Sequence, residues 1–186
     1  KMIENLAAEC RMPLCYGGGV KTVEQAQKIL CLGVEKVAIS SAVFDNPTLI
    51  SDLAERVGRQ SVVVVLDVKK RAFSGKYDCY THNGKMRRNV CAIKFAQKVE
   101  QLGAGEIIIN SIDNDGVMKG YDLKIITAVK QSVGIPVTAL GGAGNYEDIK
   151  TLVSAHPIIG AAAGSLFVFK GKYKAVLINY PTVAVK

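Results

Sequence analysis

Two stretches of the sequence repeat the same order of features, and this repeat constrains the fold more than any other signal. Residues 13–44 read PLCYGGGVKTVEQAQKILCLGVEKVAISSAVF, and residues 136–167 read PVTALGGAGNYEDIKTLVSAHPIIGAAAGSLF. Each stretch passes from a proline through a strand, a Gly-Gly turn, a helix and a second strand. Each then ends in a turn of small residues with a serine before a phenylalanine. The repeat therefore predicts a barrel with twofold internal pseudosymmetry.

Short β-branched runs alternate with amphipathic helical patterns along the whole chain. The predicted strands are 14–16, 36–39, 62–68, 106–110, 137–140 and 158–161. Thr22 is expected to cap one helix, Pro47 to begin a second that ends near Gly58, and residues 89–102 to form a third. Strands that alternate with helices form right-handed βαβ units around a parallel sheet.

Six βα units are visible, whereas a closed eight-stranded barrel usually needs about 200 residues or more. The chain has 186 residues and starts on a helix-like segment, 3–9, that no strand precedes. We expect an α/β fold: one phosphate-binding (β/α)8 TIM-barrel domain over 1–186 that lacks its first two strands. Such a barrel exposes two sheet edges.

Composition excludes several classes of protein. No apolar run approaches the roughly 18 residues of a membrane helix, and no signal peptide opens the chain. The five cysteines are odd in number and lack a CxxC pair, which favours reduced thiols in the cytoplasm and no metal site. The net charge of +8 favours anionic partners. The basic runs at 69–71 and 85–88 lack stacking aromatics, so we expect no nucleic-acid partner. We also expect no membrane partner and no cofactor.

Glycine and serine follow the strands in two paired groups. Parallel barrels bind phosphate on the loops after their strands, where glycine lets the backbone approach the anion. The first predicted phosphate cup contains Gly18, Gly19, Ser40 and Ser41, and the second contains Gly141, Gly142, Gly164 and Ser165. Glycine that merely forms tight turns is the alternative. Two cups at one barrel mouth suit a long substrate with a phosphate at each end.

Acidic residues also follow two of the predicted strands. Asp67 ends the apolar strand 62–66, where a carboxylate at the barrel mouth could exchange protons with a substrate. The alternative to a catalytic role is that Asp67 is solvated or paired with Lys69. Asp113 and Asp115 follow the strand 106–110 and belong to the same rim, and the final acid of a calcium loop is absent there. His82 lies in an Asn-Gly hairpin turn between 76–80 and the basic run, and His156 lies in a loop. Neither histidine is included in the predicted site.

These residues resemble the cyclase subunit of imidazole glycerol phosphate synthase, a lyase of histidine biosynthesis. The matching stretches are YGGGV (16–20), NPTLI (46–50), VVVVLDVK (62–69), GAGEIIINSIDNDGVMKGYD (103–122), GGAG (141–144) and AAAGSLF (161–167). The resemblance implies a barrel that joins ammonia to a phosphoribulosyl-formimino ribonucleotide with a phosphate at each end. The products are imidazole glycerol phosphate and an aminoimidazole carboxamide ribotide.

The same resemblance assigns roles to individual residues. Asp67 corresponds to one of two catalytic aspartates, and the other belongs to the first strand. Asp115 and Gly116 join the second phosphate cup. Lys36 and Glu106 match two members of a charged gate at the N-terminal face of the barrel. In this family a glutaminase subunit docks at that face and supplies ammonia through the barrel.

Three departures from the family pattern and two further alternatives accompany the resemblance. Ser40 replaces a usual asparagine, and Leu140 replaces a usual serine. The ending 167–181 is similar to that of a paralogous branch associated with amidation of sugars in surface-polysaccharide (lipopolysaccharide) synthesis, rather than to the usual acidic, helix-like ending. The sister isomerase of the same pathway and a non-catalytic barrel scaffold that binds a phosphorylated metabolite are the other readings.

Overall fold

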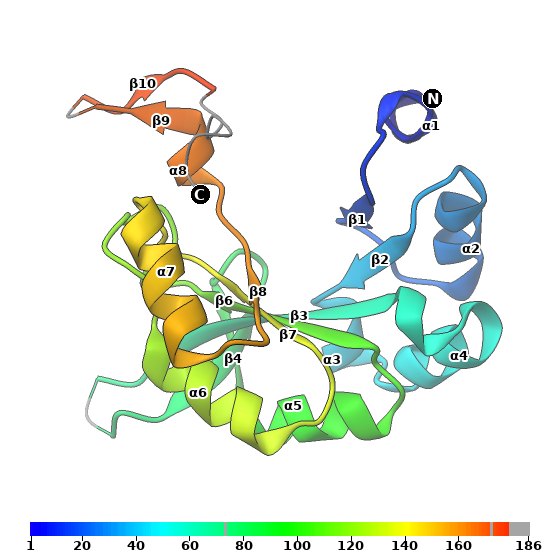
Figure 1. The fold of residues 1–186 in the computed structure, drawn as a ribbon. Helices are drawn as coiled ribbons and strands as arrows, with labels where there is room; N and C mark the ends of the chain where they lie inside the picture. Colours follow the sequence, from blue (N-terminus) through cyan, green and yellow to red (C-terminus); the bar gives the residue numbers. More distant parts are fainter. Residues whose placement is uncertain (73, 172, 179–186) are drawn as a thin grey trace.

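A curved sheet of six parallel strands forms the centre of the molecule (Figure 1). The computed structural model describes residues 1–72, 74–171 and 173–178, so positions 172 and 179–181 of the ending discussed above lie outside the described residues. The strands occur in the order β1 (Cys15–Gly17), β2 (Lys36–Ile39), β3 (Val62–Lys70), β6 (Glu106–Ser111), β7 (Val137–Leu140) and β8 (Gly160–Ala161). Each strand is parallel to its neighbour in this order. The six predicted strands are confirmed, and the last is shorter than predicted.

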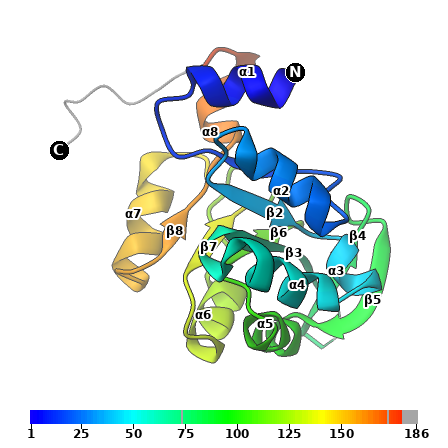
Figure 2. The same cartoon turned by 90° about the vertical axis from the view of Figure 1, so that its right-hand side faces the viewer.

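Helices cover the convex side of this sheet, and α2 packs beside α4 while α5 packs beside α6 (Figures 1 and 2). The helices are α1 (Met2–Glu9), α2 (Val23–Cys31), α3 (Ala42–Asp45), α4 (Thr48–Val57), α5 (Ala92–Gln101), α6 (Leu123–Ser132), α7 (Tyr146–Ala155) and α8 (Ser165–Val168), with a 3₁₀ turn η1 (Arg59–Ser61). The described part of the sheet is therefore an open, half-closed (β/α) barrel. In that part β1 and β8 are its two edges.

The internal repeat is reproduced in the backbone. Thr22 begins α2 with a capping box to Gln25, and Asn145, at the equivalent position, begins α7 with a capping box to Asp148. Ser41 and Gly164, also equivalent, precede the four-residue helices α3 and α8. The two halves thus begin their helices with the same local hydrogen-bonding pattern.

Strand alternation decides which side chains face the core and which face the mouth of the barrel. In β3, Val62, Val64, Leu66 and Val68 are fully buried against the helices. Because successive side chains of a strand point to opposite faces, Asp67 lies on the other, concave side. The same alternation in β6 buries Ile107 and Ile109 and leaves Glu106 and Asn110 on the concave side.

A β-hairpin, β4 (Tyr77–Thr81) and β5 (Met86–Cys91), extends from the end of β3. The hairpin predicted from the Asn-Gly turn is confirmed. It also corrects the start of the helix predicted at 89–102, because residues 89–91 belong to β5 and α5 begins at Ala92. Asn89 has a positive φ of 53°, and the pairing of Cys91 with Asp78 keeps this segment in the sheet.

Polar contacts fix the hairpin to the body of the protein. The Asp78 side chain is only 1% exposed and accepts hydrogen bonds from Arg71 (Nε, 2.7 Å) and Arg87 (Nε, 2.6 Å). The Tyr77 hydroxyl donates to Asp122 at 2.8 Å, at the start of α6. Burial and the Asp122 carboxylate together raise the pKa of this hydroxyl, so it stays protonated and able to donate. The turn of the hairpin is thereby fixed in position over the sheet.

We predict that Asp78→Asn lowers the free energy of unfolding by about 1–2 kcal/mol at pH 7, because charge-assisted hydrogen bonds are lost while both arginines can still reach solvent. The hydrogen bonds from Arg71 and then Arg87 outweigh burial and hold the pKa of the Asp78 carboxyl below its ordinary value. Its contribution is therefore present above about pH 4 and is lost as the pH falls through the lowered pKa. Urea unfolding at pH 7 and pH 3 measures this, with exposed Asp52→Asn as the control. Equal stability of Asp78→Asn and the wild type at pH 7 would contradict the prediction.

Candidate functional site

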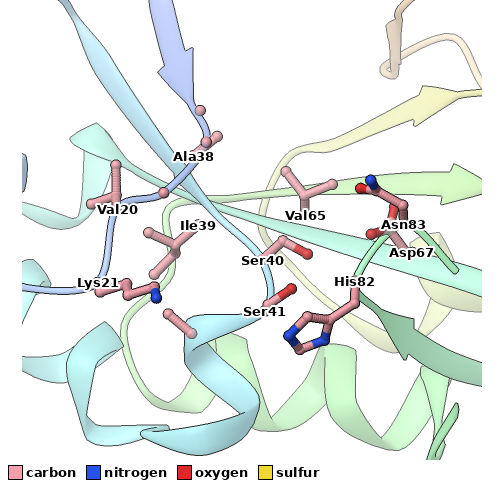
Figure 3. Close-up of a pocket in the computed structure, with 14 residues that line it drawn as sticks. Val20, Lys21, Ala38, Ile39, Ser40, Ser41, Val65, Asp67, His82 and Asn83 are labelled. Carbon is pink, nitrogen blue, oxygen red and sulfur yellow. The ribbon is translucent and has the colours of Figure 1, made fainter. Parts of the chain in front are cut away.

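A cavity of about 330 Å³ opens at the carboxyl ends of β1, β2 and β3 (Figure 3). Its lining comprises Gly17, Gly18, Gly19, Val20, Lys21, Ala38, Ile39, Ser40, Ser41, Ala42, Val65, Asp67, His82 and Asn83. The cavity therefore brings together the predicted catalytic aspartate and all four residues of the first predicted cup. The hairpin turn contributes two further residues.

Asp67 lies half-buried at the rim, paired in register with Asn110 of β6. The Asn110 Nδ2 atom donates a hydrogen bond of 2.8 Å to Asp67 Oδ1. Burial raises the pKa of the Asp67 carboxyl; the Asn110 hydrogen bond and the nearby Ser40 hydroxyl oppose this rise, and the Asp115 carboxylate adds to it. An aspartate with a raised pKa in a cavity is better matched to proton exchange near neutral pH than an ordinary one.

The alternative that Asp67 is simply paired with Lys69 is not supported by the ion pairs. Lys69 forms its ion pair with Asp113 at 3.8 Å, and the Lys70 amide donates to the same carboxylate at 3.1 Å. Among the described residues, no salt bridge reaches Asp67. Asp115 instead contributes a like charge to Asp67, so the expected gathering of acids at one rim is seen for these two residues.

The first group of glycines leaves open space beside the cavity. Gly18 and Gly19 have positive φ values of 121° and 74°, conformations that favour glycine. A Cβ atom built on either residue would meet no heavy atom within 4 Å. The Ser40 hydroxyl is buried and, across the described chain, has no hydrogen-bond partner of good geometry, although it lies close enough to favour the ionised form of Asp67. Open backbone beside a buried, unpaired hydroxyl is the arrangement that an anionic ligand would complete.

The second group differs from the first at the equivalent positions. A Cβ atom on Gly142 would lie 2.1 Å from the Gly120 carbonyl oxygen, and one on Gly141 would lie 2.8 Å from the Ser111 carbonyl oxygen. Backbone packing therefore requires both glycines, as the tight-turn alternative expected. A Cβ atom built on Gly116 or Gly164 would have no neighbour within 4 Å. The backbone of the second group is therefore open at these two residues.

A lysine from the chain's C-terminal part reaches this second region. Strands β9 (Phe169–Lys170) and β10 (Ala175–Val176) form a short antiparallel hairpin. The Lys174 Nζ atom donates to the Gly116 carbonyl oxygen at 3.3 Å. Sequence reasoning missed this contact, because nothing in the local sequence indicates that the ending folds back to the mouth.

Charged residues also meet at the opposite end of the strands. The Lys36 Nζ atom donates to Glu106 Oε2 at 2.8 Å, and the Thr138 hydroxyl donates to Glu106 Oε1 at 2.7 Å. The hydrogen bond to Glu106 raises the pKa of Lys36, so its charge is retained. The two residues of the predicted gate are thus in direct contact. Thr138 completes the cluster and was not predicted.

Sequence reasoning also missed His82 and Asn83, which line the cavity. The missing signal was the length of β3, which continues past Asp67 and pairs with β4 so that Tyr80 lies opposite Asp67. The turn that follows therefore returns to the same rim. His156 lies outside the site as expected, at the end of α7, where its Nε2 atom is 2.8 Å from the Thr127 hydroxyl.

Neither a metal-binding cluster nor a membrane-spanning helix is found among the described residues. Within the ranges that the structure describes, no group of three or more His, Cys, Asp or Glu side chains is arranged to hold a metal ion. None of the helices in those ranges is both long enough and apolar enough to span a bilayer.

Comparison with known proteins gives consistent matches. The sequence model of the family described as histidine biosynthesis protein matches residues 1–174. The chain is 63% identical over 185 residues to imidazole glycerol phosphate synthase subunit hisF3 of Vibrio vulnificus. This match covers all of the present chain and 71% of that protein. It is 52% identical over 181 residues to subunit HisF of Leptospira borgpetersenii, covering 97% of this chain and 71% of the relative. It is 41% identical over 168 residues to subunit HisF of Lactiplantibacillus plantarum, covering 90% and 67%.

We predict that Asp67→Asn raises the thermal unfolding temperature at pH 7. The raised pKa of Asp67 means that ionisation costs more in the folded than in the unfolded chain. The folded state is therefore least penalised below pH 4 and loses stability as the pH rises through the raised pKa, a loss that asparagine avoids. Melting curves at pH 3 and pH 7 should show a gain at pH 7 that shrinks at pH 3. A gain of the same size at both pH values would show that ionisation is not its cause.

Proposed function

The chain belongs to the family of histidine biosynthesis proteins, and on that premise we propose that it is the cyclase-type subunit of a glutamine-amidotransferase-coupled synthase. The proposed activity is that of a lyase resembling imidazole glycerol phosphate synthase. Ammonia reacts with a phosphoribulosyl-formimino ribonucleotide, and cleavage with ring closure gives imidazole glycerol phosphate and an aminoimidazole carboxamide ribotide. The similarity of the chain to subunits bearing this enzyme's name, over nearly its whole length, supports the proposal.

One observation carries the chemical part of the proposal: the Asp67 carboxylate at the cavity rim, hydrogen-bonded by Asn110 and raised in pKa by burial. In the proposed reaction Asp67 transfers protons to and from the substrate as ammonia adds and the ring closes. Asn110 holds the carboxylate in one orientation, because its amide donates to Oδ1 and leaves Oδ2 for the substrate.

We assign the two ends of the substrate to two different regions at the mouth of the barrel. The open amides at Gly18 and Gly19, with the hydroxyls of Ser40 and Ser41, bind one phosphate. The region of Asp115, Gly116, Gly164 and Ser165 receives the other end. In that region the required glycines Gly141 and Gly142 shape the loops rather than leave space.

The cluster of Lys36, Glu106 and Thr138 lies at the amino-terminal ends of the strands, opposite Asp67. We assign it to the ammonia gate, and the surface around it to the docking site of a glutaminase partner. Ile158 is 83% exposed beside Glu106 and Thr138, in one surface depression with them. An exposed apolar side chain next to a charged cluster is suited to a partner that covers both.

A second function uses the same barrel. Amidation of a sugar in surface-polysaccharide synthesis would also need ammonia from a glutaminase partner. Lys174 favours this candidate, because it belongs to the ending that is similar to that branch, and its Nζ atom donates to the Gly116 carbonyl oxygen in the region assigned to the second end of the substrate. Rescue of a histidine auxotroph by the gene supports the histidine pathway. Failure of rescue by a well-expressed protein favours the sugar pathway.

We predict that Asp67→Asn in the full-length protein lowers ammonia-dependent turnover of the bisphosphorylated ribonucleotide by about 10²- to 10⁴-fold, the usual contribution of a positioned acid or base. Formation of the carboxamide ribotide provides the assay. Asp52→Asn, on the exposed face of α4, should retain wild-type turnover. Wild-type turnover by Asp67→Asn would rule out the catalytic assignment of this residue.

We predict that Lys36→Met separates the two nitrogen sources. With the glutaminase partner present, glutamine-driven turnover should fall about tenfold. This fall corresponds to an increase of about 1.4 kcal/mol in the activation free energy for the passage of ammonia. Turnover driven by added ammonium should stay near the wild-type rate, because Lys36 is not among the residues that line the cavity. Paired assays with glutamine and with ammonium measure this. Equal losses in both assays would exclude a gate at Lys36.

A further inference from the structure

The turn of the β4–β5 hairpin lies over the first phosphate cup. Pairing of Asp67 with Tyr80 brings the hairpin back to the rim, and His82 follows two residues later. His82 shares the cavity lining with Ser40 and Ser41. Figure 3 shows its imidazole ring directed toward the two serines, on the side of the cavity opposite Lys21. The cup therefore has a wall that the glycine and serine pattern did not include.

The backbone at His82 adopts a left-handed conformation within the loop 82–85, beside the two central residues of the turn. The Lys85 amide donates to the His82 carbonyl oxygen at 3.3 Å, so Asn83 (φ 57°) and Gly84 (φ 75°) are the two central residues of the turn. A hairpin of this type needs positive φ at those two positions. His82 is outside them, yet its φ is also positive, at 55°. Such conformations of non-glycine residues are uncommon and gather at functional sites.

One ring nitrogen of His82 lies within hydrogen-bond distance of a neighbouring side chain. The His82 Nδ1 atom lies 3.1 Å from the hydroxyl of Thr81, a fully buried residue. Within the described chain, no hydrogen bond reaches the Nε2 atom. The Nε2 atom is therefore the one available to a ligand, and the buried Ser40 hydroxyl in the same cavity has no partner of good hydrogen-bond geometry among the described residues.

The charges around this ring suit a bound anion. Lys21 faces the cavity from the loop after β1, Asp67 faces it from β3, and the two serines of the loop after β2 are neutral. A phosphate dianion would accept hydrogen bonds from the serine hydroxyls and from Nε2–H. The same dianion would favour the protonated imidazolium, as any nearby negative charge does.

We propose that His82 is a direct ligand of the phosphate in the first cup, donating from Nε2 and closing the cup from the hairpin side. The inference rests on the proposed function, because it takes the cup of Gly18, Gly19, Ser40 and Ser41 as a phosphate site. It adds a histidine that the glycine and serine pattern does not contain. The hairpin is then part of the binding site, and its anchoring at Asp78 serves ligand binding.

The two histidines of the chain allow a direct test in the wild-type protein. Imidazole resonances are followed by NMR over pH 5–8.5, without anion and with saturating sulfate. Sulfate is used because it stays a dianion over this range, whereas inorganic phosphate changes between monoanion and dianion within it. We expect sulfate to raise the pKa of His82 by about 0.5 to 1 unit and to leave His156 unchanged. His156 is the internal control, because its Nε2 atom is already bonded to Thr127.

A pair of variants tests the same contact by affinity. His82→Gln should weaken binding of both sulfate and inorganic phosphate about 5- to 10-fold at pH 6. The loss for sulfate, whose charge does not change with pH, should be smaller at pH 8.5, because an uncharged imidazole donates a weaker hydrogen bond to an anion. His156→Gln should bind like the wild type at both pH values.

The possible outcomes separate this inference from the proposed function. Saturable anion binding without a change in the His82 pKa would overturn the role of His82 and leave the cup intact. Absence of sulfate and phosphate binding to the wild type would overturn both the cup and the histidine ligand.

Discussion

The parallel pairing of β3 with β6 is the constraint on which the rest of the structure depends. Six residues of each strand are in register, from Val63 opposite Glu106 to Val68 opposite Ser111. This register places Asn110 beside Asp67, and alternation along both strands turns the two side chains to the concave side. Glu106 lies four residues before Asn110 on the same face. Glu106, in its contact with Lys36, and Asp67 at the rim are therefore separated by about 13 Å along the strands.

Burial of the Asp67 carboxylate lowers the stability of the folded state. The burial of apolar side chains on the other face of the same strand offsets this loss. The neighbours Leu66 and Val68 are fully buried against the helices, so the strand cannot move outward to hydrate the carboxylate without exposing them. The Asn110 hydrogen bond and the nearby Ser40 hydroxyl oppose the rise in pKa without reversing it. A residue held in a costly environment by its surroundings is the expected property of a catalytic acid or base.

Sequence patterns predicted the local elements well and the long-range contacts poorly. The six strands, the cap at Thr22 and the hairpin turn depend on short-range chemistry, and all were found. The position of His82 in the cavity lining was missed because it depends on β3 extending beyond Asp67 and pairing backward with β4. The contact of Lys174 with Gly116 joins segments far apart in the chain and has no local signal. The family resemblance identified Lys36 and Glu106, which composition alone would have left as surface charges.

The internal repeat preserves backbone turns more faithfully than it preserves the surroundings of those turns. Gly18 and Gly19 face open space, whereas the equivalent Gly141 and Gly142 are held against the backbone of Ser111 and Gly120. A loop from between β6 and α6 has filled the second position, because the Gly120 amide donates to the Gly142 carbonyl at 2.8 Å. The two halves of the barrel mouth thus have similar backbone turns but differ in the free space beside those turns. Two similar phosphates at the ends of one substrate would meet different atoms, and the substrate would be bound in one direction only.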